Sequence, residues 1–255
     1  MANKKKSQRT EENLRNERRF MIGPRLSFAG AEAYKLLRTN IMFSFSDHNS
    51  TDGKVIGVTS SVPGEGKSMT MINLAYTFAE SRKRVLLIEG DMRLPTMANR
   101  LRLRQAPGLS DLMVGLNDIG DAVQHFTTAK EGAEPVTIDI IVAGTIPPNP
   151  SELMGSARLD ALLGVLRKTY DYIFLDQPPV TAVTDALITA PKTDGTIIVV
   201  RNNHASRGAL ADTMRQLRLV DAHILGFVYN GASDDSRKYY KKGYYKKGYY
   251  YYKKT

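Results

Sequence analysis

Apolar and polar residues follow one another along the chain in short blocks. Six apolar blocks are rich in Val, Ile and Leu and end in polar turns, which is typical of buried strands in a parallel sheet. One predicted strand begins at Val55, and the others cover Arg84–Asp91, Ile138–Ala143, Tyr172–Asp176, Thr196–Arg201 and Ile224–Tyr229. Pro178 and Pro179, which follow Asp176 and Gln177, require the chain to leave the sheet there, since proline cannot continue a central ladder.

Segments with helical spacing separate these strands. The predicted helices cover Ala31–Phe45, Met69–Ala79, a short turn of helix up to Val114, Ser151 to about Lys168, Thr184–Ala190 and Arg207–Val220. Strands that alternate with helices predict an α/β fold with a doubly wound, mainly parallel sheet. Ligands of such sheets bind beyond the carboxyl ends of the strands.

The 255 residues are enough for one sizeable α/β domain. We place this domain at residues 29–233. Residues 1–28 lack a sustained apolar period and are interpreted as a flexible basic arm, and residues 234–255 as a disordered tail rich in Tyr and Lys.

Composition and charge limit the cellular locations and partners that we expect for the protein. No apolar run reaches the ~18 residues of a membrane-spanning helix, and the charged N-terminus lacks the apolar core of a signal peptide. The chain has no cysteine. Of the formal charge of +10, residues 236–255 carry +8 and residues 1–19 carry +4, so the body is close to neutral. We therefore expect a cytoplasmic protein with two basic ends that suit an anionic surface or partner.

A glycine-bearing turn at residues 60–68, SSVPGEGKS, joins the first predicted strand to the next helix. Such turns direct backbone N–H groups at phosphate oxygens, and the helix that follows adds its N-terminal dipole. The expected nucleotide-binding residues are Pro63, Gly64, Glu65, Gly66, Lys67, Ser68 and Met69. Lys67 would reach the terminal phosphates, and the Ser68 hydroxyl would bind Mg²⁺. The alternative, an ordinary turn with a surface lysine, fits this strand–loop–helix context less well.

Acidic residues at two other strand ends complete the predicted site. Asp91 and Asp176 are the expected Mg²⁺ ligands, because Mg²⁺ prefers oxygen ligands. Glu89 lies on the same face of its strand as Asp91 and is the expected general base. Arg93 either neutralises phosphate or holds Asp91 in place, and Asp185 either acts near the phosphate or caps a helix. The four histidines are scattered and show no ligand spacing.

Eight tyrosines follow in a repetitive lysine-rich end, YYKKGYYKKGYYYYKKT. They are Tyr239, Tyr240, Tyr244, Tyr245, Tyr249, Tyr250, Tyr251 and Tyr252. The segment is an inert solvated end, a binder of nucleic acid or anionic membrane, or a tethered phosphorylation substrate. Tyr without Phe or Trp favours a role for the hydroxyl group, and so the third interpretation.

Several motifs in this order resemble the bacterial tyrosine kinases (BY-kinases) of capsular and exopolysaccharide synthesis. The likeness is to their separate cytoplasmic kinase subunit in Gram-positive bacteria, the CpsD/CapB-like type. It rests on SSVPGEGKS, LLIEGDMRLP, IFLDQPP, GTIPPNPSEL, PVTAVTDALI and the terminal tyrosine cluster. The likeness extends from about Glu32 to the C-terminus.

The resemblance implies a P-loop NTPase fold of the MinD-like type, with ATP and Mg²⁺ as cofactors. It implies that Lys67, Glu89, Asp91 and Asp176 are catalytic and that the tail tyrosines are phosphorylated between subunits. It also implies a homo-oligomeric ring, with an octamer as one candidate size, a membrane-spanning activator or polysaccharide co-polymerase subunit, and a cognate tyrosine phosphatase. The kinase would be recruited to the inner face of the cell membrane by its partner, and no nucleic acid is expected.

The family's oligomerisation motif falls on Glu32, Lys35 and Arg38. Their spacing alone predicts only a solvated, ion-paired strip of helix, so their role in a ring depends on the resemblance.

Three positions depart from the family pattern. Residue 89 is Glu where Asp is usual, residue 35 is Lys where Arg is usual, and Ser61 replaces the first glycine of the turn. The longer side chain of Glu89 moves its carboxylate outward, which puts the rate or the base role in question. Lys35 lacks the planar fork of arginine.

Two other functions fit parts of the sequence. A ParA/MinD-like regulatory ATPase shares the fold, but such proteins usually carry a lysine early in the loop, where this chain has Val62. An adaptor that binds membrane or nucleic acid through its basic ends predicts binding that weakens steeply with salt and no phosphotyrosine.

Overall fold

The structure, a computed structural model, describes residues 22–46 and 52–231. Seven strands form one sheet in the order β3-β4-β2-β5-β1-β6-β7. The strands are β1 (Lys54–Ser60), β2 (Val85–Glu89), β3 (Gln124–Thr128), β4 (Val136–Ile141), β5 (Tyr172–Asp176), β6 (Gly195–Arg201) and β7 (Ile224–Asn230). Every neighbouring pair is parallel except β3 with β4. The predicted doubly wound, mainly parallel fold is confirmed.

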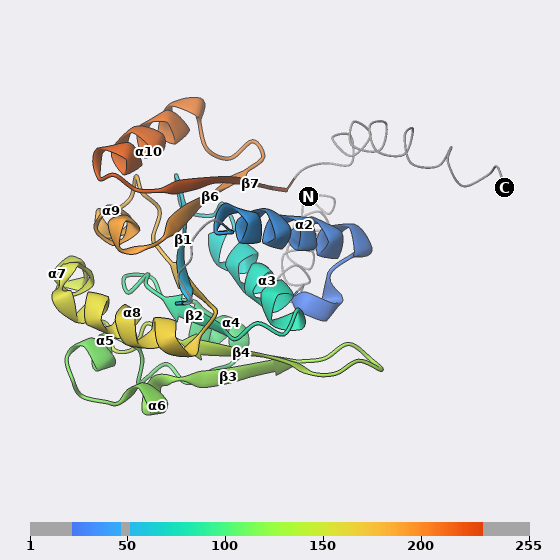
Figure 1. Cartoon of the computed structure of the whole chain (residues 1–255). Helices are drawn as coiled ribbons and strands as arrows, with labels where there is room; N and C mark the ends of the chain where they lie inside the picture. The colour runs from blue at the N-terminus through green and yellow to red at the C-terminus, as the bar shows by residue number, and fades with distance from the viewer. Residues whose placement is uncertain (1–21, 47–51, 232–255) are drawn as a thin grey trace, which may run out of the picture.

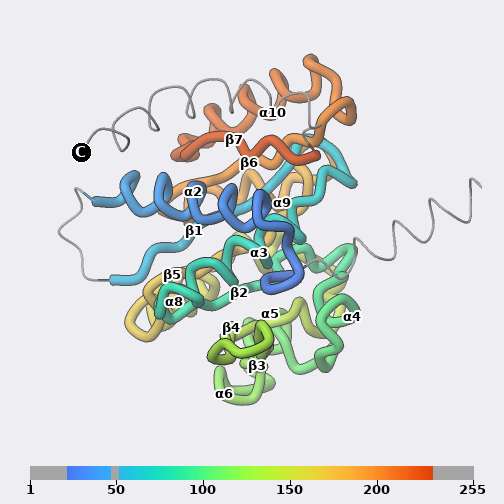
Figure 2. The backbone as a smooth tube through the Cα atoms, turned by 90° about the vertical axis from the view of Figure 1, so that its right-hand side faces the viewer, coloured from blue at the N-terminus to red at the C-terminus, as the bar shows by residue number. Residues whose placement is uncertain are grey.

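Helices cover both faces of the sheet. The α-helices are α2 (Phe28–Ser44), α3 (Lys67–Glu80), α4 (Met97–Leu101), α5 (Leu109–Met113), α6 (Ile119–Ala122), α7 (Pro150–Gly155), α8 (Ala157–Thr169), α9 (Asp185–Thr189) and α10 (Arg207–Leu219). Two short 3₁₀ helices are η1 (Gly23–Arg25) and η2 (Ala190–Lys192). Figure 1 shows α2 and α3 on one side of the sheet and α7 to α10 on the other. In the rotated view of Figure 2, α2 and α3 lie in front of the central strands.

Apolar side chains pack against both faces of the sheet. The alternating side chains of β2 illustrate this, since Leu87 packs with α3 and α4 on one face while Leu86 and Ile88 pack with α8 on the other. All three side chains are fully buried. Burying aliphatic side chains on both faces stabilises a central strand by about 1.5–3 kcal/mol per residue. The apolar runs in the sequence are continuous because these strands are buried on both faces.

The structure contains elements that were not predicted, and it divides one helix that was. Strand β3 was not predicted, because QHFTT contains no aliphatic residue; at the sheet edge its residues are alternately more and less buried. Helices α4 and α6 were also missed. The single helix predicted from Ser151 is two helices, α7 and α8, because Ser156 adopts extended backbone angles between them.

The last residues of the predicted arm pack against the domain. Gly23 is buried, and its N–H donates a hydrogen bond to Asn73 Oδ1 at 2.8 Å. Helix α2 then begins at Phe28, where the Ser27 side chain accepts a hydrogen bond from the Gly30 N–H. Residues 1–21 of the arm lie outside the described part of the chain. Within that described part, no helix is both long and apolar enough to cross a membrane.

Candidate functional site

The turn between β1 and α3 has the backbone conformation that the glycine motif predicts. Gly64 and Gly66 have positive φ angles of 84° and 89°. A Cβ atom at Gly66 would lie 2.3 Å from Asn230 Nδ2, so this position tolerates only glycine. Lys67, Ser68 and Met69 form the first turn of α3, whose N–H groups have no partner within the helix.

The carbonyl groups of the turn contact residues at the ends of β6 and β7. His204 Nε2 lies 2.8 Å from the Pro63 oxygen, Arg201 donates to the Gly64 oxygen at 3.3 Å, and Asn230 donates to the Glu65 oxygen at 2.8 Å. The N–H and C=O of a trans peptide point in opposite directions. The N–H groups of residues 64–66 therefore point away from these side chains, which leaves them available to an anion.

The Glu65 side chain supports the turn from inside the protein. Its carboxylate is buried and accepts hydrogen bonds from the N–H groups of Ser61 at 2.8 Å and Val62 at 3.1 Å. Glu65 can therefore contribute to phosphate binding through its backbone, while its side chain fixes the shape of the turn. The Met69 side chain packs against the apolar core, so Met69 can likewise contribute to phosphate binding only through its backbone N–H.

Four predicted residues meet beyond the carboxyl ends of β1, β2 and β5. Lys67 Nζ lies 3.0 Å from Asp176 Oδ1 and 3.4 Å from Asp91 Oδ2. The Ser68 hydroxyl donates to Asp176 Oδ2 at 2.7 Å. Burial alone would lower the pKa of Lys67, but Asp176 and Asp91 outweigh it and raise the pKa. Lys67 is therefore a cation held between two carboxylates.

This group of oxygen atoms suits Mg²⁺. The ion usually binds one or two carboxylates together with substrate phosphates and water, and here a hydroxyl and two carboxylates converge beside an anion-binding turn. Among residues 22–46 and 52–231, no group of three or more His, Asp or Glu side chains is arranged to hold a metal ion. The chemistry of Ser68, Asp91 and Asp176 therefore fits a magnesium ion shared with a nucleotide.

Arg93 binds another protein residue in this structure. Its guanidinium donates to Asp185 Oδ2 at 2.8 Å and to Asp185 Oδ1 at 3.1 Å, and also to Ser151 Oγ at 2.8 Å. Burial alone would raise the pKa of Asp185, but the hydrogen bonds from Arg93 and Ser151 outweigh it and lower the pKa. Arg93 was considered either to neutralise phosphate or to hold Asp91 in place. These contacts support the second role, because they fix the loop that carries Asp91.

Glu89 has a different environment from the other predicted acids. It is the register partner of Asp176 on the neighbouring strand, so both side chains lie on the same face of the sheet. Both of its oxygens accept backbone hydrogen bonds, from Thr96 at 2.6 Å, Met97 at 2.7 Å and Ala143 at 3.1 Å. Burial raises the pKa of Glu89, and these three hydrogen bonds oppose the rise. Its role as a base stays a prediction.

The predicted oligomerisation residues lie on α2. Glu32 and Lys35 form an exposed ion pair at 2.9 Å. Arg38 Nη1 donates to the Thr77 oxygen of α3 at 2.7 Å, within the same chain. The eight predicted phosphorylation sites, Tyr239 to Tyr252, lie outside the described residues.

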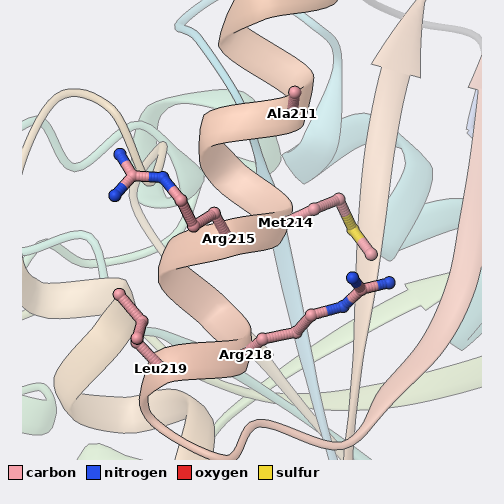
Figure 3. Close-up of a pocket in the computed structure, with 5 residues that line it drawn as sticks. All are labelled: Ala211, Met214, Arg215, Arg218 and Leu219. Carbon is pink, nitrogen blue, oxygen red and sulfur yellow. The ribbon is translucent and has the colours of Figure 1, made fainter.

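A hollow on α10 lies apart from these residues (Figure 3). Its lining consists of Ala211, Met214, Arg215, Arg218 and Leu219, all on one helix. None of them belongs to the turn before α3 or to the loops after β2 and β5. The hollow therefore plays no part in the candidate nucleotide site.

Sequence reasoning missed the residues that support the site from other strands. Arg201, His204 and Asn230 follow or end β6 and β7, and Ser151 lies in the first turn of α7. The signal that was available for the first three is their position at the carboxyl ends of predicted strands, which face the site in a parallel sheet.

Comparison with known proteins extends these observations. Residues 53–225 match the family described as AAA domain. The tyrosine-protein kinase YwqD of Bacillus subtilis is 34% identical over 201 residues, which cover 79% of this chain and 81% of that protein. The kinase domain of the Escherichia coli tyrosine kinase ETK superposes with a TM-score of 0.71 at 29% identity, over 80% of this chain and 78% of that one. MinD from Pyrococcus horikoshii, at 22% identity, 71% and 72% coverage and a TM-score of 0.56, shares the fold.

Proposed function

The chain belongs to the family of bacterial tyrosine-protein kinases, and from this premise we propose that it phosphorylates its own C-terminal tyrosines with ATP. The acceptors are Tyr239, Tyr240, Tyr244, Tyr245 and Tyr249–Tyr252 of a neighbouring subunit. The proposal is supported most directly by the meeting of Lys67, Ser68, Asp91 and Asp176 at one edge of the sheet.

In the proposed reaction, the bond between the γ-phosphorus and the β,γ-bridging oxygen of ATP breaks, and a bond forms between that phosphorus and a tyrosine oxygen. ADP leaves with the bridging oxygen, and a carboxylate of the site accepts the hydroxyl proton. The N–H groups of residues 64–69 bind the phosphates, and Lys67 stabilises the charge on the transferring group. Mg²⁺ held by Ser68, Asp91 and Asp176 would supply further positive charge.

Phosphorylation of the tail would reverse its charge. Each phosphate adds about −1.5 to −2 charges, so several additions turn the cationic segment 236–255 anionic. Repulsion between modified tails would then loosen a ring of subunits assembled through Glu32, Lys35 and Arg38. Phosphorylation and removal of phosphate by a tyrosine phosphatase would thus drive a cycle of assembly.

The cellular role that we propose is the regulation of capsular or exopolysaccharide synthesis and export. A membrane-spanning activator subunit would recruit the kinase to the inner face of the cell membrane. The basic ends of the chain fit such a site, since anionic lipids attract lysine and arginine.

Incubation with ATP and Mg²⁺, followed by mass spectrometry, tests the proposed kinase activity. We expect phosphate on the tail tyrosines of the wild type and none in Lys67→Met. A mixing experiment tests transfer between subunits. Lys67→Met is combined with a variant that keeps Lys67 but has phenylalanine at every tail tyrosine, so only the inactive chain carries acceptors. The absence of ATP-dependent phosphotyrosine, even with the cytoplasmic segment of the activator present, would refute the kinase proposal.

A further inference from the structure

Glu89 ties together three segments of the protein. Its Oε1 atom accepts hydrogen bonds from the N–H groups of Thr96 at 2.6 Å and Met97 at 2.7 Å, where α4 begins. Its Oε2 atom accepts from the Ala143 N–H at 3.1 Å, just after β4. The chain therefore forms a closed loop from the end of β2 to the start of α4. Strands β2 and β4 are neighbours in the sheet, and α4 lies close to both (Figure 1).

These contacts satisfy backbone groups that would otherwise lack partners. The first N–H groups of a helix have no acceptor within it, and the Thr96 side chain forms no capping hydrogen bond at the start of α4. The Glu89 carboxylate supplies the acceptor instead. Leaving a buried N–H without a partner is unfavourable, so the carboxylate is firmly held in this orientation.

The same contacts occupy both oxygens of the Glu89 carboxylate with donors of the protein. The residue is 1% exposed, and both of its oxygens are engaged with backbone N–H groups. A general base must approach the hydroxyl to about 2.6–3.2 Å. Asp91 and Asp176, in contrast, both contact Lys67 in the nucleotide site.

The closed loop carries Asp91. That side chain is fixed at both oxygens, by the Leu94 N–H at 3.2 Å and by Lys67 at 3.4 Å. If the loop opened at Thr96 and Met97, the Asp91 carboxylate would move relative to Lys67. A misplacement of about 1 Å can reduce a rate on the order of 10²-fold.

We infer that Glu89 is a positioning residue, which holds the 90–97 loop closed so that Asp91 faces Lys67. The inference rests on the proposed kinase function. It also gives a reason for Glu at this position, because the shorter side chain of Asp would withdraw the carboxylate by one methylene from its three donors.

Glu89→Asp separates the positioning role from the predicted role as a general base, because the two roles predict opposite changes in activity. A positioning carboxylate that withdraws by one methylene loses its contacts, so activity falls. A base restored to the length usual in the family keeps or gains activity. Glu89→Gln retains the length but replaces one oxygen with an NH₂ group that cannot accept a hydrogen bond. It is the variant to use if Glu89→Asp does not fold.

The experiment compares the full-length wild type, both variants and Glu80→Gln, a control that removes an exposed carboxylate at the end of α3. Three quantities are measured: hydrogen exchange of the amides of residues 96, 97 and 143, the melting temperature without nucleotide, and kcat with its dependence on Mg²⁺. We expect faster exchange and a melting temperature lower by about 4 °C or more in both variants. We also expect kcat to fall roughly 10–100-fold and half-saturation to require more Mg²⁺. The control should match the wild type.

The inference is overturned if Glu89→Gln keeps the exchange and melting behaviour of the wild type and yet loses activity. It is also overturned if Glu89→Asp is at least as active as the wild type. An inactive wild type would refute the kinase function instead. The exchange of the three amides would still show whether Glu89 holds the loop.

Discussion

The Arg93 guanidinium lies against the Asp185 carboxylate with two hydrogen bonds, from Nε at 2.8 Å and from Nη2 at 3.1 Å. The pair joins the loop after β2 to the start of α9. Ser151 of α7 donates to the same carboxylate, so three segments far apart in the sequence meet at Asp185. The Asp185 side chain is 1% exposed and that of Arg93 is 39% exposed. The pair therefore restrains the loop that carries Asp91 through contacts separate from those of Glu89.

Breaking this pair should destabilise the protein. In Arg93→Ala the buried Asp185 carboxylate loses its charged partner, and we expect the free energy of unfolding to fall by about 1–3 kcal/mol, less than for a fully buried pair because Arg93 is partly exposed. Urea denaturation measures this change. Arg93→Lys should recover only part of it, since lysine cannot form the two-pronged contact.

The exposed pair of Arg215 and Asp212 on α10 offers a matched control. Arg215→Ala should change the free energy of unfolding by less than about 0.5 kcal/mol. Equal losses in Arg93→Ala and Arg215→Ala would show that burial of Asp185 adds nothing to the pair.

The pKa of Asp185 predicts a pH dependence. Hydrogen bonds with Arg93 and Ser151, which outweigh the effect of burial, lower the pKa of Asp185 below the ordinary 3.8. A lowered folded-state pKa stabilises the protein above the unfolded value, and this stabilisation is lost as the pH falls through the folded-state pKa. Acid unfolding of Asp185→Asn should therefore show a shallower loss of stability below pH 3.8 than the wild type. The pKa of Asp171 is also lowered, because its contacts with Arg84 outweigh burial. Both proteins therefore keep the part of the pH dependence of stability that Asp171 contributes.

Lys67 should stabilise the site even before nucleotide binds. Lys67→Met removes the cation between Asp91 and Asp176, and the two carboxylates then repel each other. We expect a free energy of unfolding lower by about 1–3 kcal/mol without nucleotide, and a kcat lower by about 10²-fold or more. Thermal melting and a phosphorylation assay measure these effects. Lys168→Met, at an exposed position of α8, serves as the control and should change neither.

Two glycines should respond to alanine with opposite signs. Gly66→Ala places a Cβ atom 2.3 Å from Asn230 Nδ2 at a φ of 89°, so we expect a loss of at least about 1 kcal/mol and much weaker ATP binding. Gly164 lies within α8 with open space around its Cβ position, and Gly164→Ala should stabilise by about 0.5–1 kcal/mol. Denaturation and binding of a fluorescent ATP analogue test both. Normal ATP binding by Gly66→Ala would contradict the proposed shape of the turn.

The central strands and the nucleotide site were predictable from the sequence because both leave local signals. Buried parallel strands are continuous apolar runs, and the turn 60–68 combines glycines with Lys67 and Ser68 in fixed spacing. In a parallel sheet, strand ends meet at one edge, which brought Asp91 and Asp176 to that turn without knowledge of any distance. Strand β3 left no comparable signal, since an edge strand needs few apolar side chains.

The sequence determined which chemical groups reach the site, and only the tertiary structure decided how they are used. Glu89 and Asp91 are two residues apart and were both predicted to face the nucleotide. Long-range packing separates them: the start of α4 and the end of β4 engage Glu89, while Lys67 contacts Asp91. Arg93 likewise pairs with Asp185, 92 residues further along the chain. The donor that each carboxylate contacts depends on segments brought together by burial of the apolar cores, and no local spacing encodes that choice.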